Sequence, residues 1–399
     1  MIYKLNLKII IYISKLKNTN KTVIKRNDCR VCGNKHIKEI FNFGSMPMAG
    51  GFLNKDEIKK KELKVPLKIF FCEKCLLLQV KDSINYKILF NDYKYSSSTI
   101  PDLNNHFYDY FIKIKNKFKK EKKINLLEFG SNDGVLLKYF LKSKKFFCLG
   151  VDPAKNISNI ALKKKINTFV GLFNVTNSKK IKLKHGKFNY ITGSNVFAHI
   201  NDIHSVVDAA KNLLKNDGIF ATEVHYLPNL LKLNQYDFIY HEHLNYYTVT
   251  SLIKLFELHN MNLFDVEMIP THGGSIRVYV SKNLKKRKKQ RLNKLIKSEN
   301  KINIKYLFEF RKKIIKQKNL MIRLLDKINK IDKKIVGYGA SGRGTILLNY
   351  CNIDKKKVKC IIDDSPLRYN KFMPGVKIPI YNEKYLKKKI DSINYILII

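Results

Sequence analysis

The sequence predicts an α/β protein with a doubly wound, mainly parallel sheet at its centre. A small cysteine-bearing domain precedes this sheet, and a half-sized nucleotide-binding domain follows it. Three observations support the prediction: two CxxC pairs lie before residue 76, short β-type runs alternate with helical stretches from Ile124, and a second glycine-rich strand–helix unit begins near residue 334. Alternation of strands and helices is typical of parallel sheets. A chain of 399 residues is long enough for two or three such domains.

The charge of the chain does not by itself indicate a nucleic-acid partner. There are 78 Lys and Arg residues against 32 Asp and Glu, a formal net charge of +46, but only nine of the 78 are Arg. Surfaces that bind nucleic acid usually rely on Arg for bidentate contacts. Since Lys, Ile and Asn are abundant along the whole chain, we interpret the charge as compositional drift over solvated positions and expect no nucleic-acid partner.

Residues 1–24 are expected to form a disordered leader. Their apolar core is about five residues long and is interrupted by Lys, whereas a membrane span needs about 18. The seven cysteines are an odd number, and four of them lie in CxxC pairs, which favours a metal in a reducing compartment over disulfides. The sequence therefore predicts a cytoplasmic protein without a membrane partner.

The first domain, residues 25–100, carries a Cx2C–x39–Cx2C pattern. Four thiolates from two knuckles match tetrahedral zinc and leave no position for water, so the metal should be structural. Gly33 suits the tight turn of the first knuckle. The alternatives are free core cysteines or a redox pair. The predicted ligands are Cys29, Cys32, Cys72 and Cys75.

The second domain, residues 101–282, begins with a glycine loop after its first strand. The segment LEFGSNDG ends at Gly134 and is expected to open a helix over GVLLKYFLK, whose N-terminus favours an anionic group. The loop lacks both the GxGxxG spacing and the P-loop Lys. Asp152 ends the next strand, where a carboxylate can accept both ribose hydroxyls. S-adenosylmethionine fits these features, and the alternative is a glycine turn that only packs the sheet.

Histidines and a glutamate gather after later strands of the same domain. Tyr240-His-Glu-His243 offers a base with a neighbouring carboxylate, and it is too short for a zinc-protease motif. His199 follows the expected fourth strand, and His272 lies in a Thr-His-Gly-Gly turn. A structural role for each histidine is the alternative.

Residues 283–330 are predicted to form a helical linker with a solvated lysine-rich face. The last domain, residues 331–399, opens with a GxGxxG loop at Gly337, Gly339 and Gly342, and Asp363 follows at a distance suited to a ribose. About 60 residues follow the loop, which is enough for one mononucleotide half. A nucleoside diphosphate is the better match than NAD, with Arg343 available for phosphate.

Together these pieces resemble the sugar C-methyltransferases that act on nucleotide-linked keto sugars. The resemblance covers residues 28 to about 398. It is carried by CRVCG, CEKC, YKYSSS, LEFGSNDGVLL, NVFAHI, QYDFIYHEHLNYYT, THGGSIRVY, GYGASGRGTILLNYC and IDDSP with PGVKIPI. It implies a zinc-binding domain, a Rossmann-like class I methyltransferase core that binds S-adenosylmethionine, and a half-Rossmann domain for the nucleotide sugar (dTDP-linked or similar).

The resemblance also implies roles for individual residues. His243 would remove the proton next to a ketone, at C3 in the family's chemistry, and Glu242 would orient or polarise it. The enolate oxygen or sugar would be held by Tyr240, His199 and Tyr95. Cofactor contacts are assigned to Glu128, Gly130, Asn132, Asp133, Gly134, Asp152 and Asn195. Substrate contacts are assigned to Tyr93, His272, Gly337, Gly339, Gly342 and Arg343.

Three departures and three alternatives accompany this reading. Glu223-Val-His225 stands where the family often has Glu-Phe-Pro, Arg343 replaces a usual Lys, and the chain stops before the family's last helix, so a truncated final domain is expected. The alternative functions are an RNA methyltransferase with a zinc module, a non-catalytic nucleotide-sugar-binding protein, and an NAD oxidoreductase built on the second glycine loop.

Overall fold

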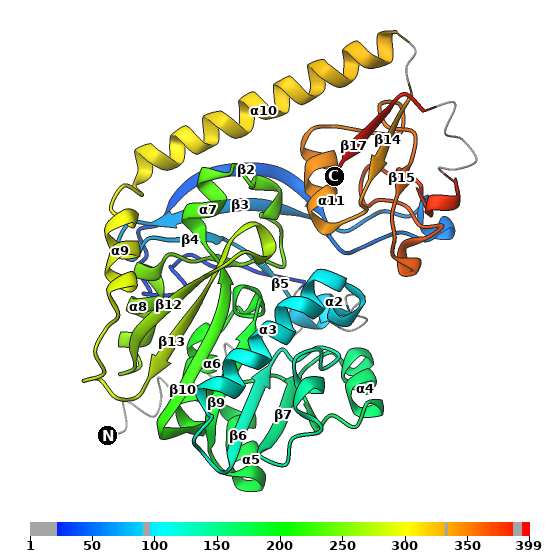
Figure 1. Cartoon of the computed structure of the whole chain (residues 1–399). Coiled ribbons are helices and arrows are strands. Elements are labelled where there is room, and N and C mark those ends of the chain that lie inside the picture. The colour runs from blue at the N-terminus through cyan, green and yellow to red at the C-terminus, as the bar shows by residue number, and fades with distance from the viewer. Residues whose placement is uncertain (1–21, 91–95, 332–333, 386–392) are drawn as a thin grey trace, which may run out of the picture.

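The structure is a computed structural model that describes residues 22–90, 96–331, 334–385 and 393–399. Its largest element is a seven-stranded central sheet (Figure 1). In spatial order the strands are β12 (Asn262–Ile269), β13 (Ser275–Ser281), β10 (Leu214–His225), β9 (Phe188–Ser194), β6 (Ile124–Phe129), β7 (Phe146–Asp152) and β8 (Thr168–Val170). The strands from β10 to β8 are parallel, and β13 runs antiparallel to both of its neighbours.

This strand order confirms the predicted doubly wound sheet. The chain starts at β6, moves outward through β7 and β8, and then returns to β9 on the other side of β6. Ligands of open α/β sheets bind at such a switch point, beyond the carboxyl ends of the strands. The loops after β6, β7, β9 and β10 therefore meet at one edge.

Helices cover both faces of the sheet. On one face, α5 (Val175–His185), α6 (Ile203–Leu213), α8 (Val249–Glu257) and α9 (Gln290–Glu299) pack on a large apolar cluster, and α3 (Pro101–Lys117) and α4 (Lys155–Lys163) cover the other. Helix α6 shows why: Ile203, Val206, Val207 and Ala210 recur at helical spacing and are all buried.

The segment after the first glycine loop differs from the helix expected there. Only the short 3₁₀ helix Leu137–Phe140 forms. Val135, Leu136 and Leu137 are consecutive and all fully buried, as is Phe140. Consecutive side chains of an α-helix point about 100° apart, so an α-helix here would need apolar neighbours on several sides. The chain makes a series of tight turns instead.

The cysteine-bearing part forms an antiparallel sheet in the order β11 (Asn245–Tyr246), β4 (Leu77–Val80), β3 (Lys64–Cys72) and β2 (Lys38–Pro47). Its edge strand β11 directly follows the Tyr240–His243 segment and pairs antiparallel with β4. A separate short ribbon joins β1 (Val23–Ile24) to β5 (Ser83–Ile84), and α2 (Tyr86–Phe90) follows it. The two parts of the chain therefore share a sheet next to the histidine segment.

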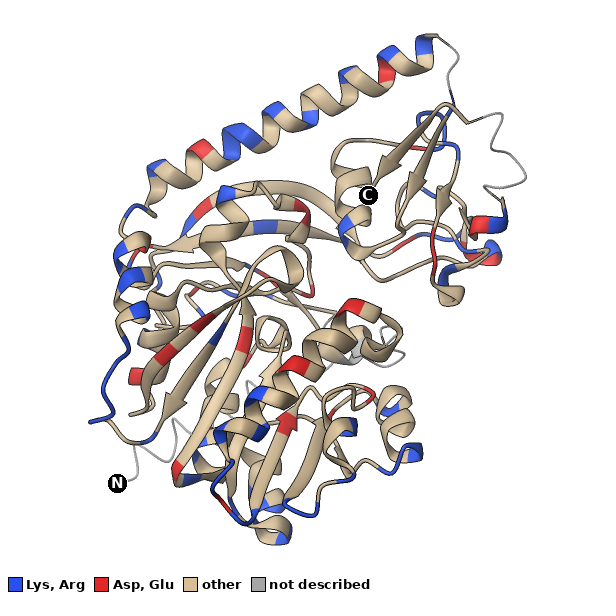
Figure 2. Ribbon diagram, viewed as in Figure 1, with Lys and Arg blue, Asp and Glu red and all other residues tan. Residues whose placement is uncertain are grey.

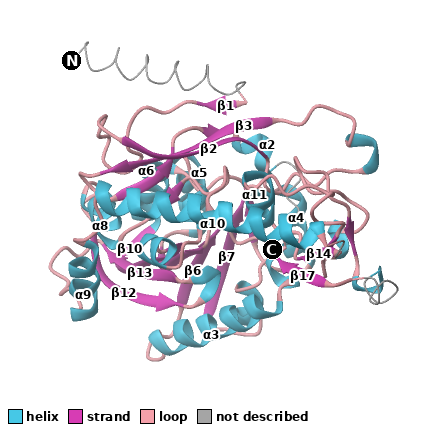
Figure 3. Cartoon of the chain, turned by 90° about the horizontal axis from the view of Figure 1, so that it is seen from above, coloured by secondary structure: helices cyan, strands magenta, loops and turns pink. Residues whose placement is uncertain are grey.

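The last part of the chain is a parallel sheet in the order β16 (Ile380–Tyr381), β15 (Ile361–Ile362), β14 (Ile335–Tyr338) and β17 (Tyr395–Ile398), with α11 (Gly342–Tyr350) after β14. The 27-residue helix α10 (Ile304–Lys330) runs from α9 to this sheet (Figures 1 and 3). Helices α9 and α10 together occupy most of residues 283–330, the range for which a helical linker was predicted.

Basic side chains are spread over the molecule. Figure 2 shows Lys and Arg on α9, along α10 and around the end of the central sheet distant from α10. No helix among the described residues is long and apolar enough to cross a membrane.

Candidate functional site

The four predicted cysteine ligands converge on one point. Their sulfur atoms all lie within 4.8 Å of one another, with Cys29 Sγ 3.4 Å from Cys75 Sγ and Cys32 Sγ 3.5 Å from Cys72 Sγ. Gly33, expected at the tight turn of the first knuckle, has a positive φ of 68°, and Leu76 takes the equivalent place in the second knuckle with φ 59°.

These residues fit a zinc ion. Zn–S bonds of about 2.3 Å in a tetrahedron place the sulfur atoms about 3.8 Å apart, close to the separations seen here. All four cysteines are free of disulfides. Four thiolates would saturate the ion, so it would hold the two knuckles together rather than activate water.

The first glycine loop closely approaches the segment that follows β9. Gly130 has φ 62°, and a Cβ atom there would lie 2.5 Å from Val196 Cγ2. Asn132 and Gly134 also have positive φ, at 50° and 78°. The loop can therefore follow this path only with glycine at position 130, which leaves its backbone bare toward the sheet edge.

Two aspartates assigned to the cofactor are engaged by the chain. Asp152, at the end of β7, accepts hydrogen bonds from the backbone N–H groups of Asn132 (2.9 Å) and Ala154 (2.8 Å). Asp133 Oδ2 accepts from Ser96 Oγ at 2.8 Å, from Ser98 Oγ, and from Lys164 Nζ at 3.3 Å. The Asp133 carboxylate thus fastens the segment before α3 to the loop.

The edge also holds polar atoms suited to a ligand. Glu128 Oε2 and Ser194 Oγ are buried without a hydrogen-bond partner among the described residues. Burial raises the pKa of Glu128 well above its usual range, and the nearby Glu223 carboxylate adds to the effect. A cationic ammonium group such as that of S-adenosylmethionine would give the orphaned Glu128 oxygen a partner and favour the ionised form of this carboxyl group. The residues therefore fit that cofactor.

Tyr240 and His243 form a hydrogen-bonded pair. The Tyr240 hydroxyl is 2.9 Å from His243 Nε2, and His243 Nδ1 is 3.0 Å from the backbone oxygen of Phe238. A carbonyl oxygen can only accept, so Nδ1 carries the proton and Nε2 offers its lone pair to the hydroxyl. The ring of His199 meets that of His243 edge-on at 4.8 Å.

Burial keeps these imidazoles neutral. It lowers the pKa of His243 well below its usual range, with His199 adding to the effect, and lowers the pKa of His199 to about 4. His199 Nδ1 has no hydrogen-bond partner among the described residues. The cluster thus presents an unprotonated His243 beside a hydroxyl donor.

Glu242 does not pair with His243, contrary to the expected arrangement. Both ring nitrogens of His243 are already bonded elsewhere, and Glu242 Oε1 lies near Gly50, 3.5 Å from where a Cβ atom on that glycine would be. In a tight turn, adjacent side chains point in different directions. Burial raises the pKa of Glu242 to about 7. The preceding His241 bonds the backbone oxygen of Val65 in β3 at 3.0 Å.

The Thr-His-Gly-Gly turn packs against the segment before Tyr240. His272 has φ 52°, and a Cβ atom on Gly273 would lie 2.1 Å from Gln235 Nε2. Gln235 also bonds the Gly273 oxygen at 3.2 Å and His225 Nε2 at 3.3 Å. The structure thus brings His272 to the same edge as the Tyr240–His243 pair.

The second glycine loop is occupied largely by the chain itself. Cβ atoms on Gly337 and Gly339 would meet Ile399 at 2.5 Å and 3.0 Å, and one on Gly342 would lie 3.4 Å from Ala49 Cβ. Arg343, expected to be available for phosphate, donates to Asp237 at 2.6 and 2.7 Å and lies over the ring of Phe238. The paired guanidinium therefore connects the last domain to the segment just before Tyr240. The predicted substrate residues Tyr93 and Tyr95 lie outside the described residues.

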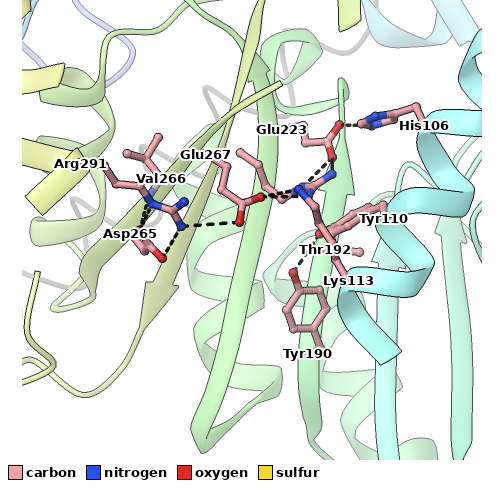
Figure 4. Close-up of polar contacts among 11 residues, drawn as sticks. His106, Tyr110, Lys113, Tyr190, Thr192, Glu223, Asp265, Val266, Glu267 and Arg291 are labelled. Atoms are coloured by element: carbon pink, nitrogen blue, oxygen red, sulfur yellow. Dashed lines mark hydrogen bonds and ion pairs between the residues drawn. The ribbon is translucent and has the colours of Figure 1, made fainter. Parts of the chain in front are cut away.

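A buried charged network was missed by the sequence analysis. Glu223 in β10 faces Arg277 in β13 across the antiparallel pair, and His106 of α3 completes the group (Figure 4). Arg277 Nε is 2.7 Å and His106 Nε2 2.9 Å from the two Glu223 oxygens. Arg277 also stacks on Tyr110, 3.5 Å from the ring centre. The sequence did contain a signal for this network, because the otherwise apolar segments ATEV and SIRV each carry one charged residue.

Comparisons with known proteins follow the same three-part division. Family models match residues 29–90 ("Putative zinc binding domain"), 104–266 ("Methyltransferase domain") and 270–399 ("C-methyltransferase C-terminal domain"). The C-methyltransferase NovU of Streptomyces niveus is 30% identical over 360 residues, which span 89% of this chain and 86% of that protein.

Two solved methyltransferase structures are also similar. Magnesium protoporphyrin IX methyltransferase from Synechocystis PCC 6803 with bound SAM is 9% identical, with a TM-score of 0.34 over 45% of this chain and 79% of that one. An S-adenosylmethionine-dependent methyltransferase from Clostridium acetobutylicum is 13% identical, with a TM-score of 0.34 over 45% of this chain and 91% of that one. At these scores the likeness carries no further argument.

Proposed function

Because this chain belongs to the C-methyltransferase family, we propose that its acceptor is a nucleotide-linked keto-deoxysugar, methylated at C3, the carbon next to the ketone. The chain is an S-adenosylmethionine-dependent methyltransferase with a zinc-binding domain. The hydrogen-bonded Tyr240–His243 pair is the observation that carries the proposal. It combines a neutral base with a hydroxyl donor, the two groups that formation of an enolate requires.

The residues divide the chemistry as follows. A ketone acidifies the hydrogen on the neighbouring carbon. When the acceptor binds, the Tyr240 hydroxyl turns its hydrogen from His243 Nε2 to the ketone oxygen, which frees the Nε2 lone pair. Nε2 then takes the proton from carbon, and the electron pair of that C–H bond forms the enolate. His199, edge-on to His243, helps to keep water out of the pocket and to orient the sugar.

Bound S-adenosylmethionine would supply an electrophilic methyl group to the enolate carbon. The glycine loop and Glu128 would hold the cofactor, with its ribose at Asp152 and its amino acid end near Asn195. The imidazolium of His243 loses its proton to solvent after transfer, because burial favours the neutral ring. The parallel sheet after α10 would hold the nucleotide.

The test uses labelled S-adenosylmethionine with a dTDP-4-keto-deoxysugar and, separately, with RNA. We expect label in the sugar and none in RNA. His243→Ala should lower kcat by at least 10²-fold while the affinity for S-adenosylmethionine, measured by calorimetry, stays unchanged. His185→Ala, at the carboxyl end of α5, is the matched control and should retain full activity. Label in RNA alone, or unchanged turnover in His243→Ala, would overturn the proposal.

A further inference from the structure

A cavity of about 920 Å³ lies beside the catalytic edge, between α3 and the β12–β13 pair. Its lining includes His106 and Lys113 from α3, Met268 and His272 from around the β12–β13 turn, and Arg277 from β13. His272 lies within electrostatic range of both His243 and His106. His272 therefore links this cavity to the site already described, although none of the residues predicted to be catalytic lines the cavity.

One wall of this cavity carries a histidine whose orientation is fixed. The side chain of His106 is 10% exposed, and its Nε2 lies 2.9 Å from Glu223 Oε2. Glu223 is fully buried and bonded to Arg277, and its carboxylate can only accept, so Nε2 donates to it. Nδ1 is the remaining polar atom of the ring, and no described residue bonds it.

The remaining lining does not suit a phosphate. Arg277 is neutralised by Glu223, and Lys113 forms an ion pair with Glu267 at 3.2 Å. Asp102 and Asp109 add negative charge to the α3 wall. The floor is apolar, with Leu103, Ile269 and Pro270 among its residues. Apolar contact together with a few directed polar groups is typical of sites for uncharged hydroxylated ligands.

We propose that this cavity receives the hydroxylated end of the acceptor, and that His106 Nδ1 forms a hydrogen bond with one of its hydroxyl groups. The inference rests on the proposed function and deepens it, because it separates a sugar subsite beside α3 from the site of the diphosphate. His106 is then a substrate-binding residue. Glu223 is a positioning residue that fixes the orientation of the His106 ring.

Two substitutions separate the two ring nitrogens. In His106→Gln the amide can still donate to Glu223 from the Nε2 position, but nothing replaces Nδ1. In His106→Asn the side-chain amide takes the place of Nδ1, but the side chain is too short to reach Glu223. Asn105→Ala, at the neighbouring exposed position of α3, is the control.

Affinities are measured by calorimetry with S-adenosylhomocysteine present, using a dTDP-4-keto-deoxysugar and dTDP alone. We expect His106→Gln to bind the sugar ligand about tenfold more weakly, which is the loss of one hydrogen bond, and to bind dTDP as the unsubstituted protein does. His106→Asn should keep most of the sugar affinity, lower Tm, and leave dTDP binding unchanged. Asn105→Ala should match the unsubstituted protein throughout.

Two results would overturn the inference while leaving the proposed function intact. One is unchanged sugar affinity in His106→Gln in a protein that methylates the sugar. The other is an equal loss of affinity for the sugar ligand and for dTDP, which indicates general damage to the fold. If the unsubstituted protein transfers methyl to no keto sugar, the proposed function fails first, and the subsite assignment fails with it.

Discussion

Replacing Arg277 with Met should destabilise the protein strongly, because it leaves a buried carboxylate with too few partners. Arg277 is 1% exposed and donates to the fully buried Glu223 through Nε and Nη2. The Met side chain keeps the apolar contact with Tyr110 but removes the charge. His106 remains as the other group bonded to Glu223.

The size of the effect follows from the carboxyl group. Arg277 and His106 overcome the burial of Glu223 and hold its pKa at about 2, compared with a usual 4.5. That difference corresponds to about 3 kcal/mol of stabilisation of the charged form. Removing one partner of a buried ion pair commonly costs about 3–5 kcal/mol. We therefore expect Arg277→Met to lower the free energy of unfolding by about 3–5 kcal/mol at pH 7.

Urea denaturation followed by circular dichroism measures this loss. Arg291→Met is the matched control, because Arg291 is half-exposed in its pair with Asp265 and should lose no more than about 1 kcal/mol. The double variant Glu223→Gln/Arg277→Met should recover part of the stability, since it removes the uncompensated charge. A loss below about 1 kcal/mol in Arg277→Met would refute the reasoning.

The pH dependence gives a further check on the same pair. A carboxyl whose pKa is depressed on folding contributes stability above its unfolded pKa, near 4.5, and loses it as pH falls toward 2. The difference between the unsubstituted protein and Arg277→Met should therefore be largest above pH 4.5 and shrink in acid. A difference that stays constant down to pH 2 would assign the effect to packing.

Three other outcomes are expected. Burial raises the pKa of Glu242 to about 7, so ionisation of Glu242 costs stability as pH rises from 4.5 to 7. In thermal scans at pH 8, Glu242→Gln should therefore be more stable than the unsubstituted protein by up to about 3 kcal/mol. Near pH 4 the two proteins should be equally stable. Cys72→Ser should abolish stoichiometric zinc in elemental analysis and unfold the β2–β4 sheet; retained zinc would remove Cys72 from the ligand set. Gly130→Ala forces a Cβ atom to 2.5 Å from Val196, so calorimetry should show at least tenfold weaker S-adenosylmethionine binding, whereas unchanged affinity would contradict the assigned loop path.

Much of the fold was predictable because its signals are local. The CxxC pairs, the alternation of strands and helices after Ile124, and the linker helices depend on neighbours a few residues apart in the chain. The prediction of a helix after Gly134 was wrong because the conformation of this segment depends on residues far away in the chain. Apolar residues at three consecutive positions do suit a buried segment, but only the surrounding core shows that it is buried on all sides.

The sequence predicted that Tyr240, His243 and His199 lie in one site, but it did not predict which side chains form hydrogen bonds or ion pairs with each other. Tyr240, His243 and His199 were expected together, and the structure places them together. The partner of His243 was expected to be Glu242 and is Tyr240. Arg343 was expected to be available for phosphate and is paired with Asp237.

By itself, the sequence determined the order of domains, the four cysteines of the zinc site and the segments proposed to carry the chemistry, because each depends on residue types at short, fixed spacings. Only the tertiary structure decided which side chains face one another. The pairing of Glu223 with Arg277 depends on strand register across 54 residues, and His106 joins them from a helix more than 110 residues earlier. The neutral state of His243 is likewise a consequence of burial, and burial exists only when distant segments pack together.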